Sequence, residues 1–391
     1  MTIETRGATA FLQWHRWQEL ELHYDNTYPN APYLSRANND DNKFSFELDG
    51  WVYFYIDMHR MSGDTRWITL AVNTCQHFID NNDEARVARG DFILTGSTVG
   101  VDRYWQAPYP YTTNGTPVPG WSSNNASAGL PLRVQILIDG QIIGAMASLA
   151  GYILDQNITA SITDANTFFA HIKRVLDSHN NSWRDDRVST SPPMTVQGSW
   201  YYPERVSGLD QVFSAILAFN HLAGACNAAI LYHKHFTDAG LLDKATRFMA
   251  FTRSNRVDTG DMYQWAYTVE TAGSEDLNHG SYSFTFFMSA KINSLLSFTE
   301  EELTKYANAT VNAWVGTKVG DLAEKFDGTG VMPVGEIFDP ASFVDLAKYN
   351  TTLLKIVTEA HAVNSKSQSN YGKMMRGAAA ILRYNQIGSL L

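Results

Sequence analysis

The sequence is poor in cysteine, in charge and in long apolar runs. Only two of its 391 residues are cysteines, Cys75 and Cys226, and each stands in an apolar helical pattern. We therefore expect two buried free thiols, which excludes a disulfide-built scaffold and a cysteine-based zinc site. Charged residues make up 18% of the chain and the formal charge is −10, which argues against a nucleic-acid partner. No stretch approaches the roughly 18 uncharged apolar residues that span a bilayer, so no membrane partner is predicted.

The sequence also lacks motifs that bind nucleotides and metals. It has no phosphate loop, dinucleotide fingerprint or serine-hydrolase elbow in a strand-to-helix context. The NNDDN run at 38–42 lacks the glycine and closing glutamate of a calcium loop, and no carboxylate accompanies His233 and His235 at ligand spacing. We predict an activity without metal or organic cofactor. No secretory signal opens the sequence, so we expect a cytoplasmic protein or a secreted one whose signal has been removed.

Aromatic residues, in contrast, are abundant. They make up 13% of the chain, and flat rings with a polar edge suit stacking on sugar rings. Many lie in two segments, 89–131 and 179–207, which are too long for plain connectors and are interleaved with arginines. This composition is typical of a groove for a carboxylated sugar polymer. The candidate stacking residues in these segments are Trp105, Trp121, Trp200 and Tyr201.

Helical periodicity dominates the sequence as a whole. Apolar residues recur at helical spacing in paired segments, which predicts helical hairpins. The pairs are 48–55 with 67–78, 138–153 with 168–176, 209–217 with 245–249, and 277–288 with 303–314. Further helices are expected at 11–24, 349–362 and 371–384, and would complete a fifth and a sixth hairpin. No composition break marks a linker, so we predict a single all-α domain over 1–391, with a short β excursion within 316–340.

An acidic residue stands at the start of the first helix in each hairpin. These residues are Asp49, Asp139, Asp210 and Asp276. Each is expected to cap its helix by accepting backbone N–H bonds at the positive end of the helix dipole. A second interpretation applies if the hairpins close into a ring, because all the helix starts would then meet at one rim. In that case Asp139, Asp210 and Asp276 would bind substrate in a shared cleft.

The strongest chemical signal is the segment 261–287, DMYQWAYTVETAGSEDLNHGSYSFTFF. If a helix starts near Asp276, then Glu275, Asn278, His279 and Tyr282 fall at spacings of three or four and share one rim. Their groups suit proton abstraction next to a carboxylate. The amide would hold a uronate carboxylate, the imidazole or a phenolate would remove the C5 proton, and a phenol would protonate the leaving oxygen at C4. The alternative is that His279 and Tyr282 are core residues with satisfied polar atoms.

The run Asn278-His279-Gly280-Ser281-Tyr282 resembles the Asn-His motif of alginate lyases and related polysaccharide lyases. Those enzymes are built on an (α/α) toroid, which the repeated hairpins also resemble. The resemblance implies a toroid that is either incomplete or made of six hairpins, with long aromatic-rich loops. It further implies that Asn278 neutralises the substrate carboxylate, and that His279 is the base or a second neutralising group.

The same resemblance implies further members of the site. The sequence is also similar to the uronyl C5-epimerases in the pattern Glu275-Asp276-x-x-His279, with Trp265 and Tyr267 upstream. This similarity implies that Glu275 is a catalytic residue and that both aromatic residues bind substrate. The lyases use an arginine and a tyrosine from another hairpin. The candidates for these are Arg205, Tyr201 and Tyr202.

Four functions remain open from the sequence. The first is a polysaccharide lyase that cleaves a uronic-acid-containing polysaccharide or oligosaccharide by β-elimination, and the second is a uronyl C5-epimerase. The third is a glycoside hydrolase using two of Asp139, Asp210, Glu275 and Asp276. The fourth is a non-catalytic glycan-binding protein. The charge of −10 favours a sparsely charged polymer or a short oligosaccharide as the partner, and the sequence predicts no particular oligomeric state.

Overall fold

The structure, a computed structural model, describes residues 14–35, 39, 42–90, 119–122, 136–180, 183–188, 196–200, 219–267, 273–313, 325–330, 339, 341–364 and 371–391. Within these ranges it is mainly helical, with two short antiparallel strand pairs. The chain divides into two compact units. The first unit comprises residues 1–30, 53–68 and 255–391, and the second comprises residues 31–52 and 69–254. Each unit therefore combines segments that are distant in the sequence.

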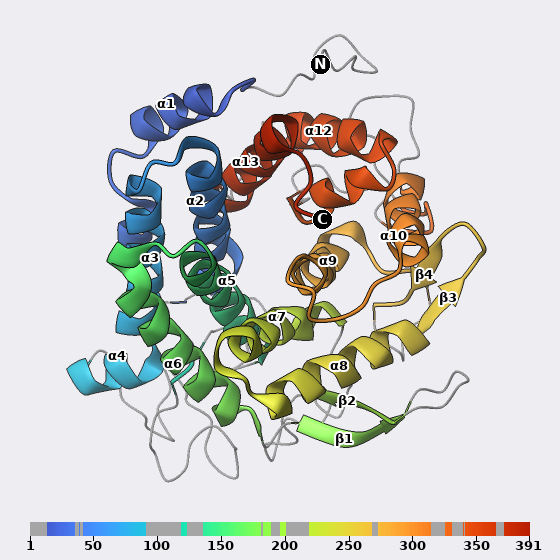
Figure 1. Cartoon of the computed structure of the whole chain (residues 1–391), viewed down its shortest axis with the longest axis horizontal. Helices are drawn as coiled ribbons and strands as arrows, with labels where there is room; N and C mark the ends of the chain where they lie inside the picture. The colour runs from blue at the N-terminus through green and yellow to red at the C-terminus, as the bar shows by residue number, and fades with distance from the viewer. Residues whose placement is uncertain are drawn as a thin grey trace, which may run out of the picture. The chain divides into compact units, whose positions relative to one another are not determined.

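The second unit is built from consecutive helices and one strand pair (Figure 1). It contains the start of α2 (Asp49–Ser62), most of α3 (Arg66–Asp80), α4 (Asp83–Arg89), α5 (Ile136–Asp155), α6 (Ile162–Ser178), α7 (Phe219–Phe236) and α8 (Ala239–Ser254). Strands β1 (Trp183–Val188) and β2 (Val196–Trp200) pair antiparallel, with Trp183 opposite Trp200. Short connections join α5 to α6 and α7 to α8, so each pair forms a helical hairpin.

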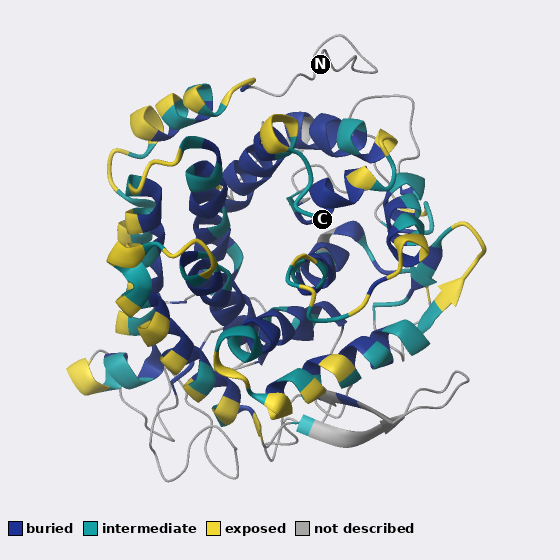
Figure 2. Ribbon diagram, in the orientation of Figure 1, coloured by how far each residue is buried: buried dark blue, intermediate teal, exposed yellow. Residues whose placement is uncertain are grey.

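The helices of each hairpin in this unit differ in burial (Figure 2). α5 and α7 are buried along most of their length, whereas α6 and α8 expose one face. Small residues let α5 and α7 approach closely, since a Cβ on Gly140 would lie only 2.8 Å from the backbone nitrogen of Ala225. α5 is long and apolar enough to cross a bilayer, but 89% of its apolar window is buried inside the protein. Its hydrophobicity is therefore that of a core helix.

The first unit holds the remaining α-helices and the second strand pair (Figure 1). Its helices are α1 (Trp17–Thr27), the larger part of α2, α9 (Leu277–Ile292), α10 (Glu300–Asn312), α11 (Ala341–Val344), the 3-10 turn η7 (Asp345–Lys348), α12 (Thr352–Asn364) and α13 (Tyr371–Ile387). Strand β3 (Arg256–Asp258) pairs antiparallel with β4 (Tyr263–Trp265). Glu275, just before α9, is held from both sides, because its N–H donates to the carbonyl of Trp265 and its carbonyl accepts from the N–H of Phe326. The chain leading into α9 is thus fixed by backbone hydrogen bonds.

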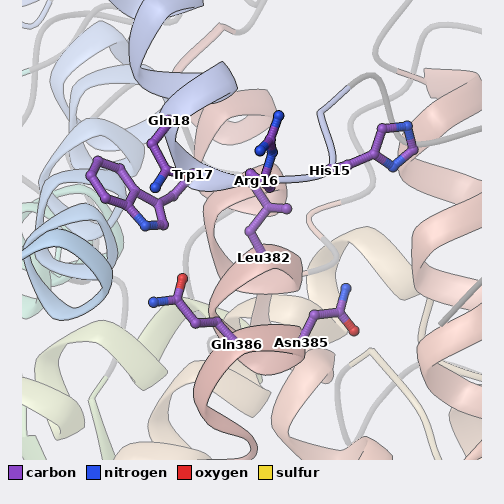
Figure 3. Close-up of a pocket in the computed structure, with 7 residues that line it drawn as sticks. All are labelled: His15, Arg16, Trp17, Gln18, Leu382, Asn385 and Gln386. Atoms are coloured by element: carbon purple, nitrogen blue, oxygen red, sulfur yellow. The ribbon is translucent and has the colours of Figure 1, made fainter.

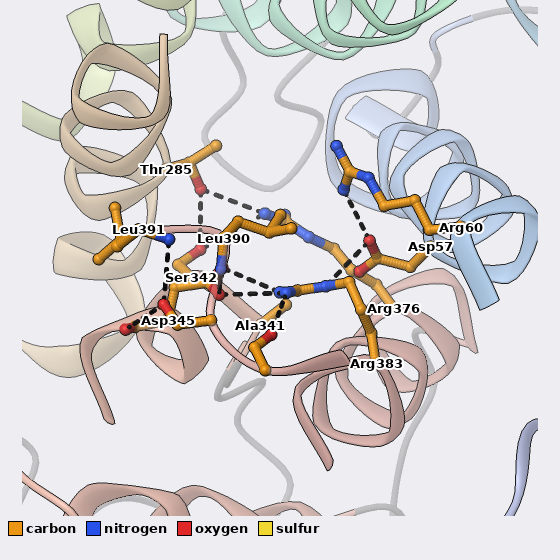
Figure 4. Close-up of polar contacts among 12 residues, drawn as sticks. Asp57, Arg60, Thr285, Ala341, Ser342, Asp345, Arg376, Arg383, Leu390 and Leu391 are labelled. Atoms are coloured by element: carbon orange, nitrogen blue, oxygen red, sulfur yellow. Dashed lines mark hydrogen bonds and ion pairs between the residues drawn. The ribbon is translucent and has the colours of Figure 1, made fainter. Parts of the chain in front are cut away.

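Buried charges hold α13 in place within this unit (Figure 4). Arg383 of α13 forms ion pairs with Asp57 of α2 at 3.2 Å and with Asp345 of η7 at 2.8 Å. Two turns earlier on α13, Arg376 donates a hydrogen bond to Thr285 of α9 at 3.2 Å. Removing one partner of a buried ion pair leaves an uncompensated charge, which is strongly destabilising. These contacts therefore fix α13 against α2, η7 and α9.

Most helices lie where the apolar periodicity predicts them. α5, α6, α8, α9, α10, α12 and α13 each overlap an expected segment. The segment 209–217 lies outside the described residues, and in the part that is described the third hairpin begins with α7. Asp49 is not the extended cap that the sequence predicts, because the π-helical turn η3 (Phe44–Leu48) runs directly into α2. Cys75 and Cys226 are buried free thiols, as predicted.

The strands lie away from the expected β excursion. Within the described residues both strand pairs fall before residue 270, and most of the segment 316–340, where the excursion was expected, lies outside them. Of that segment, the described stretch 325–330 contributes an isolated bridge between Lys325 and Asp276. The glycine content of 316–340 indicated that this segment is not helical, but it could not indicate which residues of the chain pair as antiparallel strands.

Candidate active site

The start of α9 brings together groups suited to acid–base chemistry. Asp276 is the N-cap, since its backbone is extended and its Oδ1 accepts a hydrogen bond from the N–H of His279 at 2.8 Å. The prediction that Asp276 caps a helix is therefore confirmed. Gly280 follows in the first turn, where a side chain would collide with the ring of Phe326. The absence of a side chain at Gly280 lets that ring close over the helix start.

Glu275 is a buried carboxyl group with an incomplete set of partners. Its side chain is fully buried, and its Oε1 accepts a hydrogen bond from the N–H of Asp276 at 3.0 Å. Its Oε2 has no hydrogen-bond partner among the described residues. Burial, reinforced by the neighbouring charge of Asp276, raises the pKa of Glu275 well above that of an ordinary glutamate. Glu275 therefore keeps its proton to higher pH than an exposed carboxyl group does.

Asp276 and His279 form an open carboxylate–imidazole pair. The Nδ1 of His279 is hydrogen-bonded to the Oδ2 of Asp276, and the two side chains are 41% and 22% exposed. A carboxylate that accepts from Nδ1 sets the tautomer and leaves Nε2 as the basic nitrogen. The ring of Tyr267, just after β4, lies 4.8 Å from the imidazole. The imidazole is thus oriented, partly open to solvent and adjacent to an aromatic ring.

Tyr282 lies one turn further along α9 and contacts a lysine of α13. The Nζ of Lys373 donates a hydrogen bond to the Tyr282 hydroxyl and lies 4.6 Å from the centroid of its ring. Tyr282 is 7% exposed and Lys373 is 4% exposed. Sequence reasoning missed Lys373, because no motif surrounds it and it is far from Tyr282 in the chain. Its only signal is a basic residue that stands among the apolar residues of this helix.

Glu275, Asp276 and His279 could also hold a cation. One potential ligand atom from each residue lies within 4.8 Å of the others. Imidazole and carboxylate groups together suit zinc and similar divalent ions. Both oxygens of Asp276, however, already accept hydrogen bonds from His279. The arrangement therefore favours proton transfer over metal ligation.

A second Asp–His pair lies in the second unit. Asp139, in the first turn of α5, bonds to the Nε2 of His179 at 2.8 Å and accepts from the N–H of Trp121 at 2.9 Å. Both side chains of the pair are 0% exposed. Burial raises the pKa of Asp139, and the hydrogen bond to His179 opposes that shift. The expectation that Asp139 caps its helix or binds substrate is wrong, because its carboxylate anchors Trp121 and His179 instead.

Three predicted stacking residues belong to the core. Trp121 is 1% exposed and donates from Nε1 to the carbonyl of Phe78 at 2.8 Å. Trp200 is fully buried against a second indole, and Trp265 is 8% exposed. The predicted role of Trp121 and Trp200 in sugar stacking is therefore wrong, since protein atoms cover their rings, whereas the role of Trp265 stays a prediction. Tyr267 is half-buried beside the imidazole, so its substrate-binding role stays a prediction.

The other predicted site residues lie outside the described residues. They are Trp105, Tyr201, Tyr202, Arg205 and Asp210. The backbone of Asn278 belongs to α9, but its side chain is also outside the described part. The roles assigned to these residues from the sequence stay predictions.

A pocket of about 360 Å³ lies where α1 meets α13 (Figure 3). It is lined by His15, Arg16, Trp17, Gln18, Leu382, Asn385 and Gln386. Asn385 is three turns beyond Lys373 on α13, or roughly 18 Å along the helix axis at 1.5 Å per residue. The described residues of the lining include no carboxyl group and so no acid–base pairing of the kind found at the start of α9.

Comparison with known proteins bears on the fold. No protein family model and no curated protein matches the sequence. Among solved structures, the chain resembles an inactive variant of an α-1,6-mannanase of Salegentibacter in complex with α-1,6-mannotriose, with 11% identity, coverage of 94% and 97% of the two chains, and a TM-score of 0.50. It also resembles a GH76 α-mannanase of Bacteroides thetaiotaomicron, with 12% identity, 95% coverage of both chains and a TM-score of 0.49.

A sugar epimerase from a ruminal bacterium is a third structural neighbour, with 12% identity, coverage of 82% and 74%, and a TM-score of 0.46. Identities this low bear on the fold alone. The likeness to the α-1,6-mannanase shows that the chain has the (α/α)-toroid fold, as the repeated hairpins predict.

Proposed function

We propose that this chain is a carbohydrate-active enzyme, a polysaccharide lyase that begins by removing the C5 proton of a uronic acid residue. The observation that carries the proposal is the Asp276–His279 pair, in which a carboxylate orients an imidazole that is 41% exposed. Such a pair is a general base available to a substrate. The toroid fold, shared with a mannanase solved in complex with α-1,6-mannotriose, supports a glycan as the substrate class.

The proposed reaction uses three groups of α9. His279 takes the C5 proton at Nε2 while the electron pair moves toward the substrate carboxylate, whose charge Asn278 stabilises by hydrogen bonding. The bond from C4 to the glycosidic oxygen then breaks as a C4–C5 double bond forms. Tyr282 gives its hydroxyl proton to the leaving oxygen. The raised pKa of Glu275 favours its neutral form, which limits the negative charge next to Asp276.

A panel of uronate polysaccharides and oligosaccharides tests this function. The expected result is a rise in ultraviolet absorbance from the C4–C5 double bond, with none on the carboxyl-reduced forms of the same substrates. Asn278→Ala is expected to cost about 10²- to 10³-fold in kcat, the usual cost of removing a preorganised donor. Equal processing of uronate and reduced substrates would contradict β-elimination.

A C5-epimerase would share the first step and return the proton to the opposite face. It would incorporate deuterium at C5 in heavy water without any rise in absorbance. The same incubations therefore separate epimerisation from cleavage.

A glycoside hydrolase is the second candidate. The mannanase neighbour is inactive when two consecutive aspartates are changed to asparagine, and Glu275 and Asp276 are consecutive acids here. Against it, Glu275 is fully buried and an oxygen of each carboxyl lies within 4.8 Å. Hydrolases place their two carboxyl groups roughly 5 to 9.5 Å apart around the bond to be cut. Release of reducing sugar from α-1,6-mannotriose without ultraviolet absorbance would favour this candidate.

A further inference from the structure

We propose that Lys373 is a positioning residue that makes Tyr282 a stronger acid toward the leaving oxygen, an inference that rests on the proposed β-elimination. The two side chains meet between α9 and α13, where the Nζ of Lys373 donates to the phenol oxygen and lies 4.6 Å from the ring centroid. An ammonium group so placed stabilises the phenolate that remains once the proton has left. Lys373 thus acts on the substrate through Tyr282.

Burial strengthens this effect. Tyr282 and Lys373 are 7% and 4% exposed, so little water screens the charge of the ammonium from the phenol oxygen. Among the described residues, other charged and titratable groups on the elements around this contact include Glu275, Asp276 and His279 at the start of α9, Arg376 of α13 with its partner Asp339, and His361 of α12, whose Nε2 is bonded to the carbonyl of Met374. The negative charge of Asp339 therefore faces a guanidinium, and Lys373 is the cation bonded to the phenol.

A second contact one turn away joins the same two helices. Arg376 is three residues after Lys373 on α13, and Thr285 is three residues after Tyr282 on α9, and these two are hydrogen-bonded at 3.2 Å (Figure 4). Two successive turns of each helix are thus joined. The contact between Lys373 and the phenol is therefore part of a helix–helix interface, and Lys373 is a buried lysine rather than a flexible surface one.

The proton balance of the step is simple. The Tyr282 O–H bond breaks and an O–H bond forms on the leaving C4 oxygen, while the proton from C5 rests on His279. The phenolate pairs with the Lys373 ammonium until solvent returns a proton to it and removes one from His279. No other reactant is needed.

Titration of the Tyr282 resonance in the full-length protein tests the proposal without substrate. Because the chain has 19 tyrosines, the protein is labelled with carbon-13 at tyrosine Cζ, and Tyr282→Phe identifies the resonance by its loss. In Lys373→Met the midpoint is expected about one pH unit or more above that of the parent, since a nearby opposite charge shifts titrations by about 1 to 3 units. Lys373→Arg should restore the parent value. An unchanged midpoint in Lys373→Met would overturn the role of Lys373, whatever the activity.

Kinetics on an active uronate substrate provide the second readout. Lys373→Met should lower kcat by about tenfold or more with little change in KM, and move the alkaline limb of the kcat profile to higher pH. Thr285→Val is the matched control, because it removes the neighbouring contact between α9 and α13 and leaves the phenol untouched. An equal kcat loss and alkaline shift in this control would make Lys373 merely structural. Absence of a double-bond product on every uronate would overturn β-elimination and leave the titration result standing.

Discussion

The Asp276–His279 pair of the first unit and the Asp139–His179 pair of the second contain the same chemical groups in different surroundings. In the first pair the carboxylate and imidazole are 22% and 41% exposed, whereas in the second both are 0% exposed. The first joins residues three apart on one helix start, and the second joins residues 40 apart in the sequence. One pair is open to a substrate, and the other is closed within the protein.

Exposure decides what such a pair can do. In a buried Asp–His pair the hydrogen-bonding groups are bonded to other protein groups. Asp139 bonds His179 and the N–H of Trp121 in this way, so the pair stabilises the fold. A pair at an open helix start leaves one ring nitrogen for a reacting group. Motif searches that score residue types alone would treat the two pairs alike.

The largest expected effect is on turnover, from His279→Ala. Loss of the general base should lower kcat by about 10²- to 10⁴-fold. The free energy of unfolding should change by less than about 1 kcal/mol, because the side chain is partly exposed and fills little core volume. Activity assays and chemical denaturation on the same preparation check both. Full activity, or an unfolded variant, would assign His279 a structural role.

The counterpart in the closed pair is His179→Ala, for which the expected effect is on the fold. Removing this partner takes from the buried Asp139 carboxyl its side-chain hydrogen bond and opens a cavity, so the free energy of unfolding should fall by about 3 to 5 kcal/mol. The kcat of the molecules that remain folded should be unchanged. A stable but inactive His179→Ala protein would instead assign the catalytic role to the Asp139–His179 pair.

A smaller effect is expected from Glu275→Gln, and it depends on pH. Because the pKa of Glu275 is raised above the 4.5 of an ordinary glutamate, the folded protein keeps a proton that the unfolded chain releases. The free energy of unfolding of the parent should therefore fall as pH rises above 4.5. The glutamine variant cannot titrate and keeps an acceptor for the N–H of Asp276, so it should be the more stable protein by a margin that grows with pH. Equal pH dependence in both proteins would show that this carboxyl is not held neutral.

The smallest effect is expected from metal removal. Since both Asp276 oxygens accept from His279, exhaustive chelation should change kcat by less than about twofold. Loss of activity that zinc or manganese restores would instead assign Glu275, Asp276 and His279 to a metal centre.

Local spacing made part of the site predictable. Two turns at the start of one helix contain Asp276, His279 and Tyr282. Recognising where this helix begins was therefore enough to predict that these residues are neighbours. The same reasoning failed for Trp121, because a loop with few apolar neighbours in sequence folds onto the end of α3 and the start of α5, where Phe78 and Asp139 bond it. The reasoning also missed Lys373, because the sequence of α13 does not indicate that the Nζ of this lysine contacts the Tyr282 hydroxyl of α9.

The sequence by itself determined most of the helices, the pairing of α5 with α6, the free thiols and the capped start of α9, because each depends on residues close together in the sequence. Only the tertiary structure decided which of two Asp–His pairs is open, which tryptophans are core, and which cation contacts Tyr282. Those outcomes depend on burial and on contacts between residues tens to hundreds of positions apart. The burial of these particular side chains is a property of the packed chain, and their residue types and local spacing did not reveal it.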